Sequence, residues 1–198
     1  MKFGFKKFAV ILSACVSIYG FAYADSKPGG CTIAGPENAV LTIEEYSDFE
    51  CPYCAKGSEV MKQVLKDYDG KVKLVFRNLP LPFHKNAEIA AKAFTAVCLQ
   101  SPSLAHSFQT TLFANQDKVT KEGETYIFKV AKKLGVDVSV MKADMQGPKV
   151  AEILADDKAA ADSHNFKGTP SFMIGSEAVV GARPYTEFKR IIDRQLGL

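Results

Sequence analysis

The chain has 198 residues, a formal net charge of +3 and five cysteines, and 47% of its residues are hydrophobic while 24% are charged. This composition is that of a single globular domain and excludes a disordered or collagen-like chain. The excess charge is confined to the first 24 residues, where Lys2, Lys6 and Lys7 are the only charged side chains. The other 22 basic residues are balanced by 22 acidic ones, so no basic surplus is left for phosphates and we expect no nucleic-acid partner.

Residues 1–24 have the features of a secretory signal peptide. The three lysines precede an apolar run over residues 8–21, and Ala22-Tyr23-Ala24 is a typical cleavage motif. The apolar run is shorter than the roughly 20 residues that cross a bilayer. An alternative is a lipoprotein box that ends at Cys15, although the apolar residues after Cys15 disfavour a lipid tether. We therefore expect cleavage and export to the periplasm, with a membrane-tethered lipoprotein as the alternative.

The remaining chain divides into an arm and one domain. Residues 25–38 are polar and contain several Gly and Pro residues, which predicts an N-terminal arm before a domain over 39–198. β-Branched and alternating apolar residues predict strands at 39–46, 72–76, 171–174 and 178–180. Apolar residues three and four apart, together with capping residues, predict helices at 52–68, 87–99, 102–112, 127–134, 150–164 and 184–196.

The order of these elements predicts the fold class. A strand–helix–strand unit, several helices, and then a hairpin with a final helix are typical of one α/β domain with a mixed central sheet flanked by helices. The helices over about residues 84–164 interrupt that pattern. We expect them to form an inserted helical subdomain.

The chemistry is carried by Cys51-Pro52-Tyr53-Cys54, a C-x-x-C motif directly after a predicted strand and at the start of a predicted helix. The free N–H groups and positive dipole of a helix start stabilise a thiolate at Cys51 and lower its pKa. Pro52 suits the first helical position, where no N–H is needed. Cys54 lies one turn inside and is expected to be buried. Cys51 is therefore the predicted nucleophile of thiol–disulfide exchange, and Cys54 the resolving thiol.

Two other interpretations of the motif are a structural disulfide and half of a zinc site. A zinc site needs two further ligands at compact spacing, and the sequence has no second C-x-x-C and no H-x₃₋₅-H pair. The redox interpretation is therefore favoured. We expect no metal and no cofactor other than the redox-active disulfide between Cys51 and Cys54.

Three further residues are candidates for the same site. Pro170 precedes the strand at 171–174, and in a C-x-x-C domain we expect it to form a cis peptide bond beside the sulfurs. The backbone of Thr169 would then pair with a substrate peptide. Glu45 precedes Cys51 by six residues, and an inward-facing carboxylate there would accept the Cys54 proton. Because the adjacent Glu44 faces the opposite way, a solvent-exposed Glu45 is the alternative.

Several segments together resemble the DsbA-like thiol:disulfide oxidoreductases. They are residues 46–54, Arg77 with Pro80, His84 ahead of an Ala-rich helix, Gly168-Thr169-Pro170, and Gly181-Ala182-Arg183-Pro184. The resemblance covers about residues 36–196 and implies a thioredoxin fold with a helical insertion. It also implies that Cys51 and Cys54 are the redox pair, that Pro170 is the cis-proline and that Glu45 occupies the family's acidic position.

Cys31 and Cys98 are the cysteines outside the motif and the signal. Some relatives in the resembled family carry a second disulfide inside the insertion, but residues 143–145 offer Cys98 no partner there. Cys98 continues an apolar helix stripe and is interpreted either as a small buried residue or as the partner of Cys31. A bridge would protect the Cys31 thiol in an oxidising compartment, and we treat this structural disulfide as a hypothesis.

These features predict an exported thiol:disulfide oxidoreductase. The leading hypothesis is an oxidase that donates its disulfide to thiols of unfolded exported proteins, which Pro52, Tyr53 and Thr169 are expected to contact. The resemblance implies reoxidation by a membrane partner of the DsbB type. The alternatives are an isomerase or reductase kept reduced by a membrane donor, and a non-catalytic metal-binding or chaperone module. Isomerases of this fold assemble through an N-terminal extension for which residues 25–38 are too few, so we expect a monomer.

Overall fold

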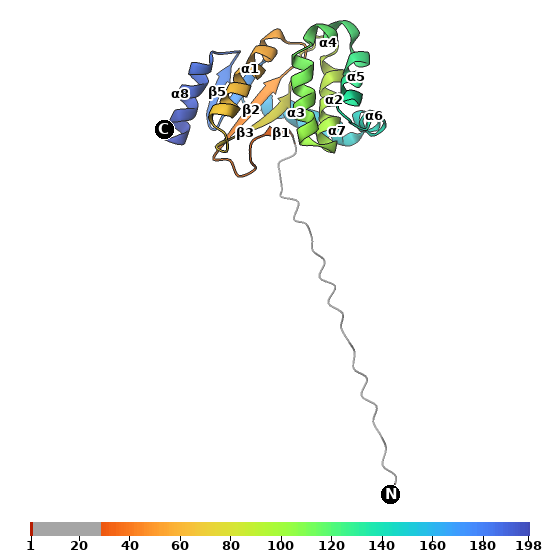
Figure 1. Ribbon diagram of the computed structural model, residues 1–198, viewed down its shortest axis with the longest axis horizontal. Helices are drawn as coiled ribbons and strands as arrows, with labels where there is room; N and C mark the ends of the chain where they lie inside the picture. The colour runs from red at the N-terminus through yellow and green to blue at the C-terminus, as the bar shows by residue number, and fades with distance from the viewer. Residues whose placement is uncertain (2–28) are drawn as a thin grey trace.

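The computed structural model describes Met1 and residues 29–198, and this part of the chain forms an α/β domain around a mixed sheet (Figure 1). The spatial order of the strands is β1-β3-β2-β4-β5; β2 and β3 are parallel, and the other neighbouring pairs are antiparallel. The strands are β1 (Cys31–Ala34), β2 (Leu41–Ser47), β3 (Val72–Asn78), β4 (Ser171–Ile174) and β5 (Glu177–Val180). The predicted fold class is confirmed.

Six of the eight helices of the described residues lie between β3 and β4 in the chain. The helices are α1 (Pro52–Asp67), α2 (Ala87–Gln100), α3 (Pro102–Phe113), α4 (Gln116–Glu122), α5 (Glu124–Lys133), α6 (Val138–Met145), α7 (Pro148–Ser163) and α8 (Tyr185–Leu196). The signal peptide and the lipoprotein box at Cys15, both predicted within residues 1–24, lie outside the described residues.

Within the predicted N-terminal arm over residues 25–38, Cys31–Ala34 forms the edge strand β1, a strand that the sequence did not predict. Cys31 and Ile33 are buried and alternate with more exposed residues, and β1 pairs with β3. A strand of four residues beside Gly and Pro gives little signal in the sequence, because its stability comes from the partner strand. The short helices α4 and α6 are likewise absent from the prediction.

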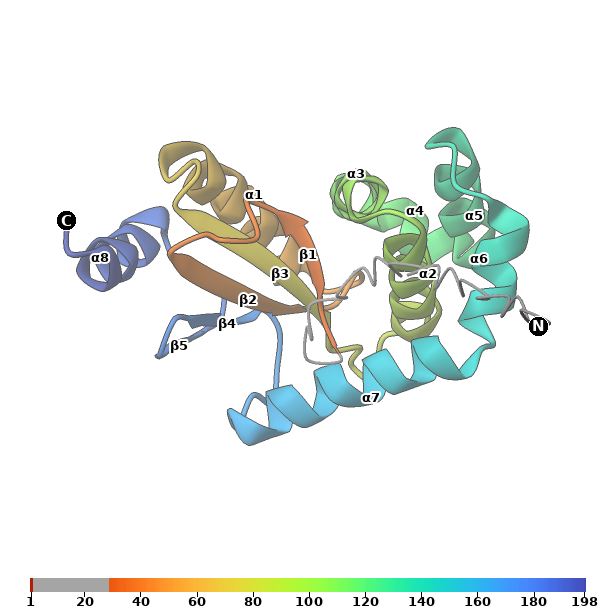
Figure 2. The ribbon, with the colours of Figure 1, turned by 90° about the horizontal axis from the view of Figure 1, so that it is seen from below.

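Alternate residues of β2 face two different layers. Glu45 is the cross-strand partner of Phe172, and a Cβ on Gly57 of α1 would lie 3.2 Å from the Phe172 ring, so α1 covers the face that carries both side chains. Tyr46 points to the opposite face, where it packs with Ala161 of α7 and with Phe166. Figure 2 shows α7 running along the side of the sheet opposite α1, with α2 to α6 grouped at one end of the molecule.

Four phenylalanines join the sheet to the inserted helices. The ring of Phe49, which follows β2, lies 5.4 Å from Phe76 of β3 and 5.1 Å from Phe113 of α3, measured between centroids. Phe94 of α2 lies 4.6 Å from Phe76. Such aromatic pairs contribute about 0.5–1.5 kcal/mol each beyond the burial of their surface. Because Phe49 precedes Cys51 by two residues, this cluster fixes the loop that enters the C-x-x-C motif.

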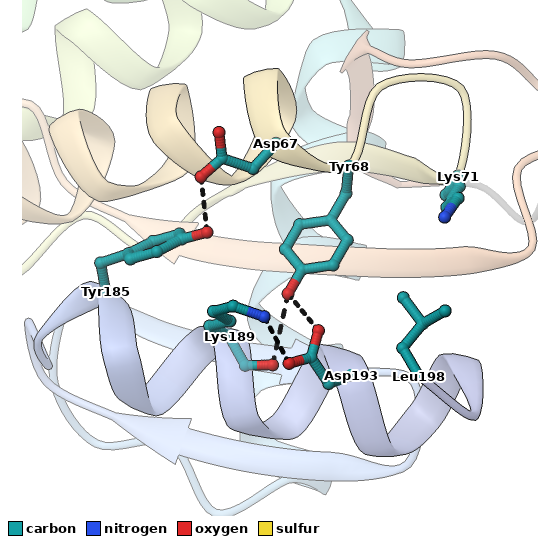
Figure 3. A pocket seen from close by; sticks show the side chains of 7 residues that line it. All are labelled: Asp67, Tyr68, Lys71, Tyr185, Lys189, Asp193 and Leu198. Carbon is teal, nitrogen blue, oxygen red and sulfur yellow. Dashed lines mark hydrogen bonds and ion pairs between the residues drawn. The ribbon is translucent and has the colours of Figure 1, made fainter.

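Two tyrosines fasten α8 to the C-terminal end of α1. The Tyr68 hydroxyl donates to the Asp193 carboxylate at 2.5 Å, and the Tyr185 hydroxyl donates to Asp67 at 2.6 Å (Figure 3). The same side chains, with Lys71, Lys189 and Leu198, line a surface hollow of about 530 Å³. This hollow lies at the opposite end of α1 from the C-x-x-C motif, and its labelled acidic and hydroxyl groups are already paired with one another.

A disulfide joins Cys31 of β1 to Cys98 of α2. The hypothesis of a structural bridge between these two cysteines is thus confirmed by the structure. It ties the edge strand, and with it the beginning of the described chain, to the inserted helices.

Loss of this bridge is expected to lower the free energy of unfolding by about 4 kcal/mol, because it closes a separation of 67 residues in the unfolded chain. The background protein is Cys51→Ala/Cys54→Ala, in which Cys31–Cys98 is the disulfide that remains among the described residues. The measurement compares denaturant unfolding of this background with that of the same protein carrying Cys31→Ala and Cys98→Ala. Reductant should destabilise the background protein by a similar amount and leave the variant unchanged. Equal stability of the two proteins under oxidising conditions would contradict the expectation.

Candidate active site

The two cysteines of the motif occupy the first turn of α1. Cys51 is the residue that caps the helix, Pro52 is its first residue, and the Cys51 carbonyl accepts the backbone N–H of Cys54 at 3.0 Å. Both cysteines are free thiols. Cys51 is 5% exposed, whereas Cys54 is completely buried. Both side chains are therefore buried, but Cys51 keeps a small exposed fraction at the helix start and Cys54 keeps none.

The two sulfurs differ in acidity because their surroundings differ. The pKa of Cys51 is lowered to about 5, first by the hydrogen bond from the Cys54 side chain and further by Thr169 and the backbone N–H groups of the first turn, against the opposing effect of burial. Burial raises the pKa of Cys54 far above that of an ordinary thiol, and the neighbouring Cys51 adds to this. Cys51 is thus the thiolate at neutral pH, and Cys54 holds its proton.

The loop before β4 lies against both the sulfurs and α1. The peptide bond between Thr169 and Pro170 is cis. The Cys51 sulfur lies 3.4 Å from the Thr169 carbonyl oxygen, to which it can donate when it is protonated, and a Cβ on Gly57 would lie 3.3 Å from the Pro170 ring. Tyr53, in the first turn of α1, is 59% exposed, and the Lys56 ammonium lies 5.2 Å from the centre of its ring. The structure thus brings Thr169 and Pro170 to Cys51, while contact of Pro52, Tyr53 and Thr169 with a substrate remains a prediction.

Glu45 is fully buried on the face of β2 that α1 covers. Burial raises the pKa of this carboxyl to about 8, and the nearby Ser47 hydroxyl opposes that effect. Neither carboxyl oxygen has a hydrogen-bond partner. The solvent-exposed alternative is therefore excluded for Glu45; the adjacent Glu44 points the other way, accepts from the Tyr46 hydroxyl at 2.7 Å and pairs with Arg77 at 3.1 Å.

Hydrogen bonds from the inserted helices hold the segment between β2 and the motif. The Gln116 side-chain amide of α4 donates to the carbonyls of Phe49 and Cys51 at 2.9 and 2.8 Å. The carboxylate of Glu50 accepts from the backbone and side chain of Asn86. These bonds satisfy carbonyls and a carboxylate beside the reactive sulfur with donors from a distant part of the chain.

Asp48 is a buried residue of this segment to which the sequence assigns no role. One of its carboxylate oxygens accepts the backbone N–H of Leu81 at 2.7 Å and lies 2.8 Å from Nδ1 of His84, and the other accepts the N–H of Glu50. The backbone N–H of Asp48 in turn donates to the Cys54 sulfur at 3.4 Å. The order Ser-Asp-Phe-Glu before the motif is the only trace of this network in the sequence, whereas Gln116 and Asn86 leave none.

Within residues 29–198 no three His, Cys, Asp or Glu side chains converge in a way that suits a metal ion. In the same part of the chain, no helix combines the length and the hydropathy needed to cross a bilayer. The free thiols of Cys51 and Cys54 lie together at the start of α1, beside the cis peptide bond before Pro170. The geometry of this cluster is that of a thiol–disulfide exchange site.

A family model described as Thioredoxin matches residues 27–194. The chain belongs to this family. A solved thioredoxin-like oxidoreductase from Silicibacter pomeroyi is 28% identical to this chain and superimposes with a TM-score of 0.75, over 86% of this chain and 94% of that structure. The probable disulfide bond formation protein D of Bacillus cereus is 28% identical over 82% of this chain and 77% of its own length. The expected likeness to thiol:disulfide oxidoreductases is confirmed.

The thioredoxin-family chain also resembles part of a larger kind of protein. The Na(+)/H(+) antiporter NhaA 3 of Salinispora tropica is 32% identical to it over 143 residues, which are 72% of this chain and 21% of the antiporter. The chain therefore spans about a fifth of the length of the antiporter relatives that it matches. This likeness concerns one portion of those proteins.

Replacing Glu45 by Gln is expected to stabilise the reduced protein, and to do so more at high pH. The folded protein raises the carboxyl pKa from an ordinary 4.5 to about 8, so folding is penalised increasingly as pH rises from 4.5 to 8. The gain in unfolding free energy should be about 3 kcal/mol larger at pH 8 than at pH 5, at about 1.4 kcal/mol per pKa unit. Denaturant unfolding at the two pH values measures it.

The matched control is Glu44→Gln, which removes a carboxylate from the adjacent residue. The pKa of Glu44 is lowered: burial raises it, but the Tyr46 hydroxyl and Arg77 together outweigh burial. This variant should therefore destabilise the protein at pH 8. A gain for Glu45→Gln that is the same at both pH values would show that the buried carboxyl does not titrate as described.

Proposed function

We propose that this chain is an exported thiol:disulfide oxidoreductase that donates the Cys51–Cys54 disulfide to thiols of secreted or periplasmic proteins. The observation that carries the proposal is the contrast between the two sulfurs: Cys51 has a pKa of about 5 at the start of α1, and Cys54 is a buried thiol beneath it. A pair in which one thiolate is stabilised and the other held as a protonated reserve suits exchange with a passing thiol. The similarity to disulfide bond formation protein D supports the same class of reaction.

The reaction has two exchange steps. A substrate thiolate attacks the Cys51 sulfur; the Cys51–Cys54 bond breaks, and its electron pair leaves on Cys54, which takes up a proton. A second substrate thiolate then attacks the substrate sulfur of the mixed disulfide, and Cys51 leaves as a thiolate. The substrate loses two electrons and gains a disulfide, and the cysteine pair gains those two electrons.

The low pKa of Cys51 supports the direction of transfer. A stabilised Cys51 thiolate favours the reduced form of the pair, so its disulfide is a strong oxidant. It also makes Cys51 the better leaving group in the second step. Reoxidation requires an external acceptor, for which a membrane partner of the DsbB type is proposed, and the periplasm is the proposed compartment.

The surface around Cys51 is the proposed place for the substrate. Tyr53 is exposed next to Cys51, and the backbone of Thr169 precedes β4, which supports an extended peptide pairing beside the sulfur. Pro52 and Pro170 leave this approach free of competing backbone donors. Selection by reactive thiols, rather than by charge, agrees with the balanced charge of residues 25–198.

The exchange itself is tested with reduced, unfolded ribonuclease as substrate. The oxidised protein should form disulfides in it, and Cys51→Ser should abolish this activity because the attacked sulfur is lost. Cys54→Ser should instead be mixed with ribonuclease that carries scrambled disulfides: its Cys51 thiolate attacks one of them, a substrate thiolate leaves, and the mixed disulfide accumulates because the resolving thiol is absent, which a non-reducing gel detects. Activity that persists in Cys51→Ser would sink the proposed mechanism.

The direction is tested by equilibrium with glutathione. We expect a reduction potential of the Cys51–Cys54 pair above about −180 mV, the value of protein disulfide isomerase. Thiolate absorbance of the reduced protein should titrate near pH 5, since the pKa of Cys51 is lowered to about 5. A potential near the roughly −270 mV of thioredoxin would indicate the reductase instead.

A further inference from the structure

Two polar side chains lie along one face of β2 beside the motif. Residues two apart in a strand point to the same face, about 7 Å apart along the chain, so Ser47 faces the same layer as Glu45. This is the face covered by α1, because Glu45 is paired with Phe172 and Phe172 lies against Gly57. Ser47 is 1% exposed and Glu45 is completely buried.

Neither of these side chains has a hydrogen-bond partner. The described residues contain few buried polar side-chain atoms without a partner, and they are Glu45 Oε1 and Oε2, Ser47 Oγ, Thr169 Oγ1 and Asn78 Oδ1. A buried polar group left unpaired costs about 1–3 kcal/mol. Three of the four residues concerned adjoin the two sulfurs or precede them on β2. Because an unpaired buried polar group lowers the stability of the fold, its presence next to the reacting sulfurs indicates a role during the reaction.

The Cys54 sulfur lies at the end of β2 next to Ser47. It accepts the backbone N–H of Asp48, the residue that follows Ser47, at 3.4 Å. Ser47 is therefore adjacent in the chain to the residue that contacts the resolving sulfur, and it faces the same layer as the buried carboxyl of Glu45. Burial raises the pKa of both Cys54 and Glu45, and the Ser47 hydroxyl opposes that rise in both groups, which agrees with this placement.

We propose that the hydroxyl of Ser47 relays the proton between Glu45 and Cys54 during thiol–disulfide exchange. When a substrate thiolate breaks the Cys51–Cys54 bond, the Ser47 hydroxyl gives its proton to the departing Cys54 thiolate and takes one from the protonated Glu45 carboxyl. The serine is regenerated, Glu45 becomes a carboxylate, and Cys54 becomes a thiol. The reverse transfer deprotonates Cys54 when it resolves a mixed disulfide. This inference rests on the proposed function and assigns a catalytic residue to it.

The surroundings of Glu45 restrict the groups with which it can exchange a proton. The neighbouring strands contribute apolar side chains opposite it, Phe76 from β3 and Phe172 from β4. The titratable groups that α1 brings to this face are Cys54 and, at its start, Cys51. No charged side chain contributes to the pKa shift of Glu45, which arises from burial and is opposed by Ser47. Glu45 therefore exchanges its proton with the cysteine pair or with water that enters this layer.

The test measures the rate at which dithiothreitol reduces the Cys51–Cys54 disulfide between pH 5 and pH 9. Acid quenching and alkylation detect the reduced protein, and each rate is divided by the fraction of the reagent that is thiolate at that pH. In the wild type the corrected rate should fall as pH rises through about 8, where Glu45 loses the proton it donates. Ser47→Ala should lower the rate about 100-fold at pH 6 and remove this fall. Ser47→Thr keeps a hydroxyl and should restore both.

Two comparisons separate a relay from a structural effect. Glu45→Gln should give the same flat profile as Ser47→Ala, and the double variant should be no slower than either, because the two residues serve one step. Ser58→Ala removes a hydroxyl from a second buried serine, on α1, and should leave the profile unchanged. A Ser47→Ala profile that keeps its fall near pH 8, or that drops equally at every pH, would overturn the relay while leaving the exchange reaction intact. A wild type whose Cys51–Cys54 disulfide does not exchange would overturn the proposed function itself.

Discussion

Burial of the Cys54 sulfur beneath the first turn of α1 is the constraint on which the site depends. It forces Cys54 to keep its proton, and the hydrogen bond from that thiol is the largest cause of the lowered pKa of Cys51. Two identical side chains three residues apart thereby acquire opposite acidities. The helix start supplies further N–H groups to Cys51, and none of these effects requires a metal or an added charge.

This arrangement needs a rigid loop in front of α1, and the inserted helices provide it. Gln116 binds two carbonyls of the loop, Asp48 binds the backbone of Leu81, and Phe49 packs among rings from β3, α2 and α3. The Cys31–Cys98 disulfide ties the same helices to the edge of the sheet. The insertion is therefore part of the structure that positions the motif, and displacing it would move Cys51.

The interior contains two kinds of buried carboxyl, and the difference between them is instructive. Asp157 of α7 is fully buried, yet it accepts the backbone N–H groups of Gly30 and Asn78 and pairs with Arg77 at 3.2 Å. Glu45 is equally buried and has no such partner. The hydrogen-bonded carboxylate of Asp157 joins α7 to β3 and to Gly30, whereas the unpaired carboxyl of Glu45 retains a proton that can be transferred to a neighbouring group.

The sequence by itself determined the α/β class, most helices and strands, the C-x-x-C at a helix start and the candidates Glu45, Thr169 and Pro170, because spacing, capping and alternation are local properties. It left the choice between Glu44 and Glu45 open, since strand alternation shows that one is inside but not which. It missed β1, whose four residues are stabilised by the partner strand, and Gln116, which reaches Cys51 across 65 positions. Only the tertiary structure decided the pairing of Cys31 with Cys98, the burial of Glu45 and the nearness of Ser47 to Cys54. These depend on which surfaces the packed layers bring together, and that information is not local to any segment of the chain.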